Sequence, residues 1–259
     1  MFSDPTGVGN RAPQKFPQVV WALFLIQMSN WRWSWPQMLL TGMLGPMATM
    51  GALGLFARNS GPQAVQYVLA GSITMALLFE TQNKVASNFA FMKTTGAFDF
   101  YASLPVRREA LIIGTVGAFT VLALPAVVCT SLFGIFVLDV PISPSPLFLP
   151  VLAFVVLPFA GLGAWVGSRS STIDEASSVS LGITMAMIAV GPVTIPEQLL
   201  PRFLVWLGHL NPATYASSLL RQVLIGEIAP RAALDVVVLV VFSAGVWTLT
   251  RYRTKWRAA

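Results

Sequence analysis

The chain has 259 residues and a formal net charge of +6; 55% of its residues are hydrophobic and 10% are charged. Soluble domains carry about 25% charged residues, so this chain has too few to surround a folded core with a solvated surface. The composition excludes a soluble protein and predicts an integral membrane protein with a single transmembrane domain over residues 1–259. The only cysteine, Cys129, lies in an apolar run, which excludes a disulfide framework and a Cys/His metal site.

The first predicted element, residues 17–34, is an interfacial helix. It is rich in tryptophan, with Trp21 in its apolar first part and Trp31, Trp33 and Trp35 around its end. Tryptophan is enriched where membrane meets water, so we expect the segment to lie at the surface and to lead into the first span. It has no small-residue cleavage site, and we expect it to be retained. The alternative is a short extra membrane element within this segment.

Six apolar runs follow, each near the roughly 20 residues that a helix needs to cross a bilayer. In the fourth run, Gly163 and Gly167 form a G-x-x-x-G pattern that lets two helices approach closely. Packing within the chain is the favoured use of this pattern, and a dimer contact is the alternative. The predicted transmembrane helices are residues 35–56, 63–79, 111–138, 147–166, 179–195 and 232–249.

The distribution of basic residues predicts the orientation in the membrane. If both termini are cytoplasmic, the basic residues on the outer side are only Arg58, Arg202, Arg221 and Arg231, and all other lysines and arginines lie inside. Cytoplasmic loops are enriched in lysine and arginine, so we expect both termini to be cytoplasmic, as an even number of spans requires. Membrane topology explains the positive net charge, so the lipid bilayer is an expected partner and nucleic acid is not.

Residues 91–106 interrupt the apolar sequence between the second and third predicted spans, on the predicted cytoplasmic side. Here Phe98, Phe100 and Tyr101 surround a single acid, Asp99. An amphipathic helix of this kind is suited to contact with another protein, because aromatic residues are enriched at interface hot spots. The alternative is a helix that only lies on lipid.

Residues 196–228 are too polar and too often interrupted for an ordinary span, yet apolar residues recur at helical spacing. We predict two short re-entrant helices, divided at Asn211 and Pro212, that lie on or dip into the outer leaflet. The alternative is a plain external loop, although about 30 residues without secondary structure are uncommon. The only histidine, His209, has no second ligand at metal-binding spacing, so no metal site is expected.

This order of elements resembles the permease subunit of type-2 ABC exporters, a family that includes bacterial drug, antibiotic, lipid and polysaccharide exporters. The resemblance implies an all-α integral membrane protein with six transmembrane helices, a cytoplasmic amphipathic segment and an external motif before the last span. The segment that begins at Glu80 departs from the run of Glu and Arg that the family often has there. The residues that carry the similarity are Gly96, Leu104-Pro105-Val106, Asn211, Pro212, Tyr215, Arg221 and Gly226.

The resemblance also implies a mechanism and partners. Residues 91–106 would form a coupling helix that rests in a groove of a separate ATP-hydrolysing subunit. Two copies of that subunit would bind ATP and Mg, and a second permease chain would complete a homodimer or heterodimer. The complex would export a hydrophobic or amphipathic drug, lipid or glycan across the bacterial cytoplasmic (inner) membrane. The residues expected to contact the ATPase are Gly96, Phe98, Asp99, Phe100, Tyr101, Leu104, Pro105 and Val106.

Other functional classes fit the sequence less well. The chain has no G-x-x-x-x-G-K-[ST] sequence, so it is expected neither to hydrolyse ATP nor to bind a cofactor, and it has no catalytic constellation. An ion-driven secondary transporter or a channel is the alternative, but ion coupling needs an ionisable group deep in the membrane, and no predicted span has one near its centre. Asp235 is expected near the headgroups, Glu80 at the interface or on the coupling surface, and Asp174 and Glu175 near the ATPase.

Overall fold

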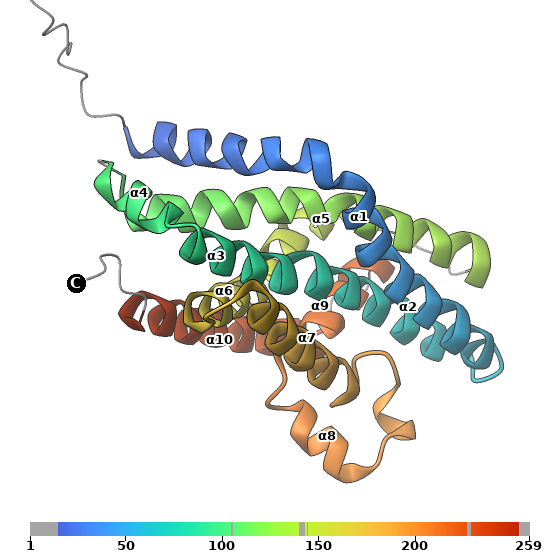
Figure 1. Cartoon of the computed structure of the whole chain (residues 1–259). Coiled ribbons are helices and arrows are strands. Elements are labelled where there is room, and N and C mark those ends of the chain that lie inside the picture. The colour runs from blue at the N-terminus through green and yellow to red at the C-terminus, as the bar shows by residue number, and fades with distance from the viewer. Residues whose placement is uncertain (1–14, 105, 140–142, 144, 227–228, 254–259) are drawn as a thin grey trace, which may run out of the picture.

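The computed structural model describes residues 15–104, 106–139, 143, 145–226 and 229–253, which form a bundle of helices with no strand among them (Figure 1). The elements, in chain order, are α1 (Phe16–Arg58), α2 (Pro62–Leu77), a π-helical segment (Leu78–Asn83), α3 (Lys84–Thr94), α4 (Ala97–Ser103), α5 (Arg108–Leu138), α6 (Phe148–Arg169), α7 (Ile173–Ala189), a 3-10 turn (Glu197–Leu199), α8 (Arg202–Gly208), α9 (Pro212–Ile225) and α10 (Arg231–Arg253).

Within the described residues, four helical stretches are long and apolar enough to cross a membrane. They are Pro62–Thr94, Glu109–Leu138, Phe148–Arg169 and Arg231–Thr250. The exposed faces of the last three carry large aliphatic residues, as a lipid environment requires. The chain is therefore a multi-pass membrane protein. The predicted count of six spans, which adds the second half of α1 and α7, stays a prediction.

The predicted interfacial helix and first span are one continuous helix in the structure, α1. Figure 1 shows that α1 bends part-way along, and a helix that contains Pro36 and Pro46 can bend without breaking. The first part of α1 lies against α5, because Gly114 leaves room for the backbone of Val20 and Phe24 to approach. The predicted boundary at residues 34 and 35 is therefore not a helix end. The side chains of the tryptophans at positions 31, 33 and 35 lie outside the described part.

The helix of residues 62–94 runs through the middle of the bundle. It combines α2, the π-helical segment and α3, so it continues well beyond residue 79, where the sequence predicted the second span to end. In its most apolar stretch of 18 residues, 83% is buried inside the bundle. A Cβ atom added to Gly163 or Gly167 of α6 would lie 2.3 Å or 2.2 Å from a carbonyl oxygen of this helix. The G-x-x-x-G pattern therefore serves packing within the chain, as the sequence favoured.

Helix α7 begins and ends about six residues earlier than the predicted fifth span. Thr172 caps its start by accepting a hydrogen bond from the backbone of Glu175 at 3.1 Å. The helix stops before Gly191, whose φ of 102° favours glycine. The following residues, including the buried Val193, pack against Gly71 of α2 in a non-helical conformation.

Different helix ends lie at the two ends of the bundle. Figure 1 shows α4, the first turns of α1 and α5 and the end of α10 at one end, and the α1–α2 turn and the end of α5 at the other. Helix α9 lies inside the bundle and packs on α2, α6 and α10, whereas α8 projects from it. The described start of α1, helix α4 and the end of α10, which the sequence analysis placed toward the cytoplasm, thus lie at one end.

The close contact between α6 and the helix of residues 62–94 leads to a stability prediction. We expect Gly163→Ala and Gly167→Ala each to lower the free energy of unfolding by about 1–3 kcal/mol, because the added methyl group overlaps backbone atoms. Gly182→Ala in α7 is the matched control, since nothing lies within 4 Å of its Cβ position. Thermal unfolding in detergent measures the three variants. Equal stability of all three would show that this contact is looser than described.

Candidate functional site

Gly96 sets the geometry of the predicted coupling segment. Its φ of 72° is left-handed, a conformation that glycine adopts without cost, and it separates α3 from α4. The Gly96 carbonyl accepts hydrogen bonds from the backbone N–H groups of Asp99 and Phe100, both at 3.1 Å. The segment is thus a short helix, α4, set at an angle to the end of α3. Residues 91–94, which the sequence placed in the same segment, belong to α3.

The residues of α4 divide into two faces. Phe98 and Tyr101 pack against the core of this chain, and the Phe98 ring meets the Phe89 ring of α3 edge-on at 5.7 Å. Phe100 is 62% exposed, and Asp99 and Leu104 are exposed beside it. The prediction treated all of these side chains as contacts for a partner. The packing instead makes Phe98 and Tyr101 anchors, because their rings already cover apolar surface of the bundle.

The remaining predicted contact residues differ in their surroundings. Val106 packs partly against the core, like Phe98, and Gly96 is half-exposed at the start of α4. Pro105 lies outside the described residues. The exposed surface that the structure leaves for a partner at this position is therefore formed by Asp99, Phe100 and Leu104, and we call it the α4 face.

The end of α3 is tied to the end of α6 beside the α4 face. The Lys93 ammonium donates to the backbone carbonyls of Ser168 and Ser170, at 3.3 Å and 2.8 Å. Helix α7 begins just after Ser170, and its first turn exposes Asp174 and Glu175. Acidic residues at a helix N-terminus are favoured by the helix dipole, so a structural role explains these two residues without a partner.

A buried ion pair lies in the helix of residues 62–94, and the sequence analysis missed it. Glu80 is 1% exposed, and its carboxylate accepts a hydrogen bond from the Lys84 ammonium at 2.5 Å. Gly42 of α1 makes room for it, since a Cβ there would lie 2.0 Å from Glu80 Oε1. Glu80 is thus neither an interface anchor nor part of the α4 face. The signal in the sequence was the spacing of four residues between an acid and a base.

Polar side chains also join α3 to α7. Ser87 and Ser177 share a hydrogen bond of 2.9 Å, and Thr184 donates to the Asn83 side chain at 3.3 Å. The Gln82 amide donates to the backbone carbonyl of Ser180 at 3.2 Å. Hydrogen bonds between helices are a main source of association in membranes, so this row fixes α7 on the central helix.

The external motif is organised by Asn211. Its side-chain oxygen accepts from the backbone N–H of Ala213 at 3.0 Å and so caps α9, and Pro212 occupies the first helical position. Its amide nitrogen donates to the carbonyls of Met187 and Val190 at the end of α7, at 2.6 Å and 2.5 Å. One side chain therefore joins the end of α7 to the start of α9.

Other residues of the motif hold α9 against its neighbours. The Tyr215 hydroxyl donates to the His209 carbonyl at 2.9 Å. The Arg221 guanidinium stacks over the Tyr67 ring of α2, 3.6 Å from its centroid, and burial lowers the pKa of Arg221. Gly226 ends α9 with a φ of 82°. The Tyr215 and Arg221 contacts thus join α9 to the turn after α8 and to α2.

Asp235 is buried between α9 and α10 near the start of the last span. It is 0% exposed, and Gln222 of α9 donates to its carboxylate at 3.0 Å. Arg231 lies 3.9 Å from the other carboxylate oxygen and forms a second ion pair with Glu197 at 3.3 Å. The expected position of Asp235 at the level of the headgroups stays a prediction. Its burial has a clear cause, because α9 folds back into the bundle and supplies a polar partner.

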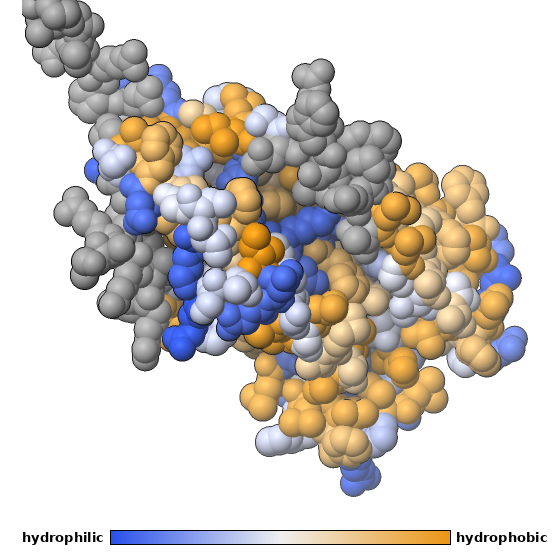
Figure 2. All heavy atoms as spheres, in the orientation of Figure 1, coloured by the Kyte–Doolittle hydropathy of each residue, from blue (hydrophilic) through white to orange (hydrophobic). Residues whose placement is uncertain are grey.

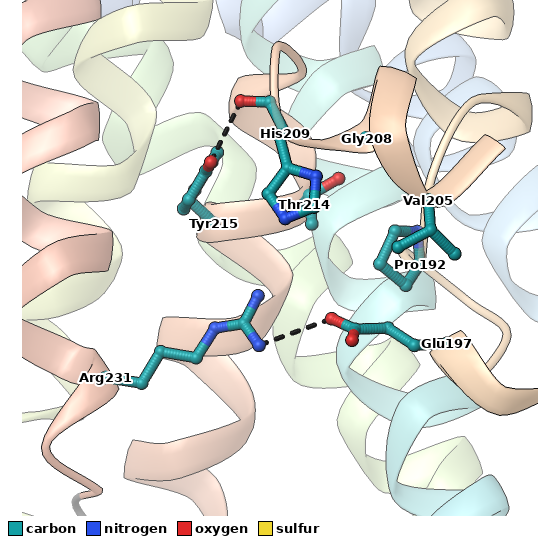
Figure 3. A pocket seen from close by; sticks show the side chains of 8 residues that line it. All are labelled: Pro192, Glu197, Val205, Gly208, His209, Thr214, Tyr215 and Arg231. Carbon is teal, nitrogen blue, oxygen red and sulfur yellow. Dashed lines mark hydrogen bonds and ion pairs between the residues drawn. The ribbon is translucent and has the colours of Figure 1, made fainter. Parts of the chain in front are cut away.

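Figure 3 shows the small hollow between the segment before α8 and the start of α10. Glu197 and Arg231 face each other across it, and the Tyr215 hydroxyl points to the His209 backbone. Among the described residues no three His, Cys, Asp or Glu side chains gather as metal ligands would. The hollow is closed by an ion pair, and its side chains form no catalytic arrangement.

Comparison with known proteins identifies the family. The model of the ABC-2 type transporter matches residues 18–225, from the first turn of α1 to the end of α9. The chain belongs to the ABC-2 type transporter family. It is a type-2 ABC permease, the membrane component of such a transporter.

Two curated proteins illustrate the similarity. The ABC transporter G family member 20 of Dictyostelium discoideum is 24% identical over 169 residues, which are 64% of this chain and 23% of that protein. The inner membrane transport permease YadH of Escherichia coli K12 is 25% identical over 162 residues, which are 62% of this chain and 63% of YadH. The matched region therefore spans less than two thirds of either relative.

The buried ion pair of the permease leads to a second prediction. We expect Lys84→Met to lower the free energy of unfolding by about 3–5 kcal/mol, because it leaves a buried carboxylate without its partner. The double variant Glu80→Gln/Lys84→Met removes both charges, and we expect it to regain most of that loss. Thermal unfolding of the single and double variants measures the coupling. Additive losses would contradict a direct interaction.

The double role of Asn211 leads to a third prediction. We expect Asn211→Ala to lower the free energy of unfolding by about 2 kcal/mol, from the lost cap and the unsatisfied carbonyls of α7. Asn211→Asp keeps the capping oxygen but turns a second oxygen toward the carbonyls of Met187 and Val190. We expect it to be no more stable than the alanine variant. If the Asn211→Asp variant were as stable as the wild type, the only role of Asn211 in stability would be to cap α9.

Proposed function

We propose that this permease is a subunit of an ATP-binding cassette exporter, in which the α4 face binds a separate ATPase subunit. The observation that carries the proposal is the division of α4. Phe98 and Tyr101 hold the helix on the bundle, while Asp99, Phe100 and Leu104 remain uncovered. An exposed aromatic side chain on a helix that is held in place is suited to a protein interface, because little conformational entropy is lost on binding.

The contacts of α4 also supply a route for movement. A displacement of α4 acts on α3 through the packing of Phe98 on Phe89. Helix α3 is bound to α6 by glycine contacts and by Lys93, so these helices move as one body. Closure of the ATPase around ATP and Mg would in this way shift the central helix of the permease. In this proposal the permease contributes the contact surface on α4 and the helices that move with it. The partner subunit contributes ATP hydrolysis.

The complete exporter would contain two ATPase subunits and two permease chains, with a homodimer as the simplest assembly and a heterodimer as the alternative. Type-2 permeases form the translocation path, and hydrophobic or amphipathic molecules such as drugs, lipids or glycans are the proposed substrates. The printed name of YadH places that relative in an inner membrane. We propose the same bacterial membrane for this chain, with both termini and α4 in the cytoplasm.

An ion-driven carrier is the second candidate, because the structure contains one feature that such a carrier needs. The buried pair of Glu80 and Lys84 lies inside a helix long enough to cross the membrane. Family membership favours the exporter. Substrate export from vesicles distinguishes the two, since the exporter requires ATP and the partner ATPase, while a carrier works with an ion gradient and this chain alone.

The α4 face leads to a fourth prediction. We expect Phe100→Ala to weaken co-purification with the ATPase subunit by about thirtyfold, as at an interface hot spot, with thermal stability unchanged. Phe203→Ala in α8 is the matched control, because Phe203 is 63% exposed at a position far from α4. We expect Phe98→Ala to lower stability as well as binding. Normal ATPase binding and ATP-coupled export by both Phe100→Ala and Tyr101→Ala would remove the basis for this assignment.

A further inference from the structure

An apolar groove of about 400 Å³ lies between the first turns of α1 and the first half of α5. Its walls are Phe16, Trp21 and Phe24 of α1 and Ile113 of α5. The Trp21 and Phe24 rings are stacked with their centroids 5.2 Å apart. Gly117 forms part of the floor, and a Cβ atom added there would make only ordinary contact with the Phe24 ring, at 3.6 Å. The groove therefore has an ordered wall and a floor without side chains.

Among the side chains that the structure describes, basic residues lie beyond one end of the groove. Helices α1 and α5 run in the same direction here, because Val20 and Phe24 lie beside Gly114 and Gly117 in the same order. Lys15 and Arg107 each precede the lining residues of their own helix, so both lie beyond the same end of the groove, and both are exposed. Glu109 is also exposed at this end and has an interaction of its own. The described charged side chains at this end are thus two basic residues and one acidic residue.

The distance from the basic residues to the far end of the groove matches one leaflet of a membrane. From Arg107 to Gly117 a helix rises about 15 Å, which is half of the roughly 30 Å of a bilayer's hydrocarbon core. The charged end of the groove is the end of the bundle that holds α4 (Figure 1). A ligand that fills this site has an apolar chain about one leaflet long and an anionic group at the membrane surface.

We propose that the groove between α1 and α5 binds one acyl chain of an anionic phospholipid, whose phosphate lies at Lys15 and Arg107. The lipid comes from the leaflet at the α4 end, so the orientation rests on the proposed function. The apolar walls exclude a polar ligand, and the two basic residues distinguish this site from the uncharged apolar surface around it. Figure 2 shows hydrophobic atoms at the start of α1. The bound lipid would then fill the space between α1 and α5 close to α4.

Native mass spectrometry of the full chain in detergent tests this site, with phosphatidylglycerol and phosphatidylcholine as probes. We expect one phosphatidylglycerol to bind at least tenfold more tightly than phosphatidylcholine. The double variant Lys15→Gln/Arg107→Gln should weaken the binding of phosphatidylglycerol by about thirtyfold. Each basic residue near an anionic lipid surface contributes about a fivefold increase in affinity. Binding of phosphatidylcholine should not change. Arg202→Gln in α8, which removes an exposed cation far from the groove, is the matched control.

Two variants test the acyl chain. Gly117→Leu fills the floor and Ile113→Trp fills the groove from a position that is 51% exposed and so outside the core. We expect both variants to weaken the binding of both lipids. We expect the thermal unfolding of the Ile113→Trp variant to be unchanged. Wild-type binding by these variants, or equal affinity of the wild type for the two lipids, would overturn the proposal.

A different occupant gives a different result. If the chain's own first residues fill the groove, lipid binds only after residues 1–14 are deleted, and that outcome also overturns the proposal. Because these measurements use the permease without an ATPase, they remain separate from the proposed coupling function. Loss of ATPase co-purification with intact lipid binding would count against that function alone.

Discussion

Close backbone contact between the helix of residues 62–94 and α6 is the constraint on which the other parts of the fold depend. Gly163 and Gly167 place two carbonyl oxygens of the central helix where side chains would otherwise stand. In lipid, apolar surface does not drive helices together as it does in water, so close packing and hydrogen bonds must hold them. Helix α7 then joins the central helix through a row of polar side chains, and α9 enters the space between α2, α6 and α10.

Three buried polar groups inside this apolar bundle are matched by partners from a nearby element or turn. Glu80 has Lys84 one turn away, Asp235 has Gln222 from α9, and the ends of α7 and α9 share Asn211. An unpaired polar group in such surroundings is costly, so these pairings restrict the helices to one arrangement. Gln222 and Asn211 reach their partners only because α9 folds back into the bundle.

The end of the bundle that holds α4 combines a fixed helix with an open surface. Phe98 and Tyr101 anchor α4, and the first part of α1 lies beside α5 across an apolar groove. Both features follow from glycine positions, since Gly96 turns the chain into α4 and Gly114 lets α1 approach α5. A partner at the α4 face and a lipid in the groove would therefore act on neighbouring parts of the same small region.

The sequence by itself determined that the chain is a membrane protein, where its apolar runs lie, that residues 91–106 are amphipathic and that Asn211 and Pro212 divide two short helices. These properties depend on local composition and on residues with strong backbone preferences. Only the tertiary structure decided that α1 is continuous, which α4 side chains are anchors, and that Glu80 and Asp235 are buried. Those outcomes depend on contacts between distant segments: a charged residue looks the same in sequence whether it meets a headgroup or a partner brought by another helix.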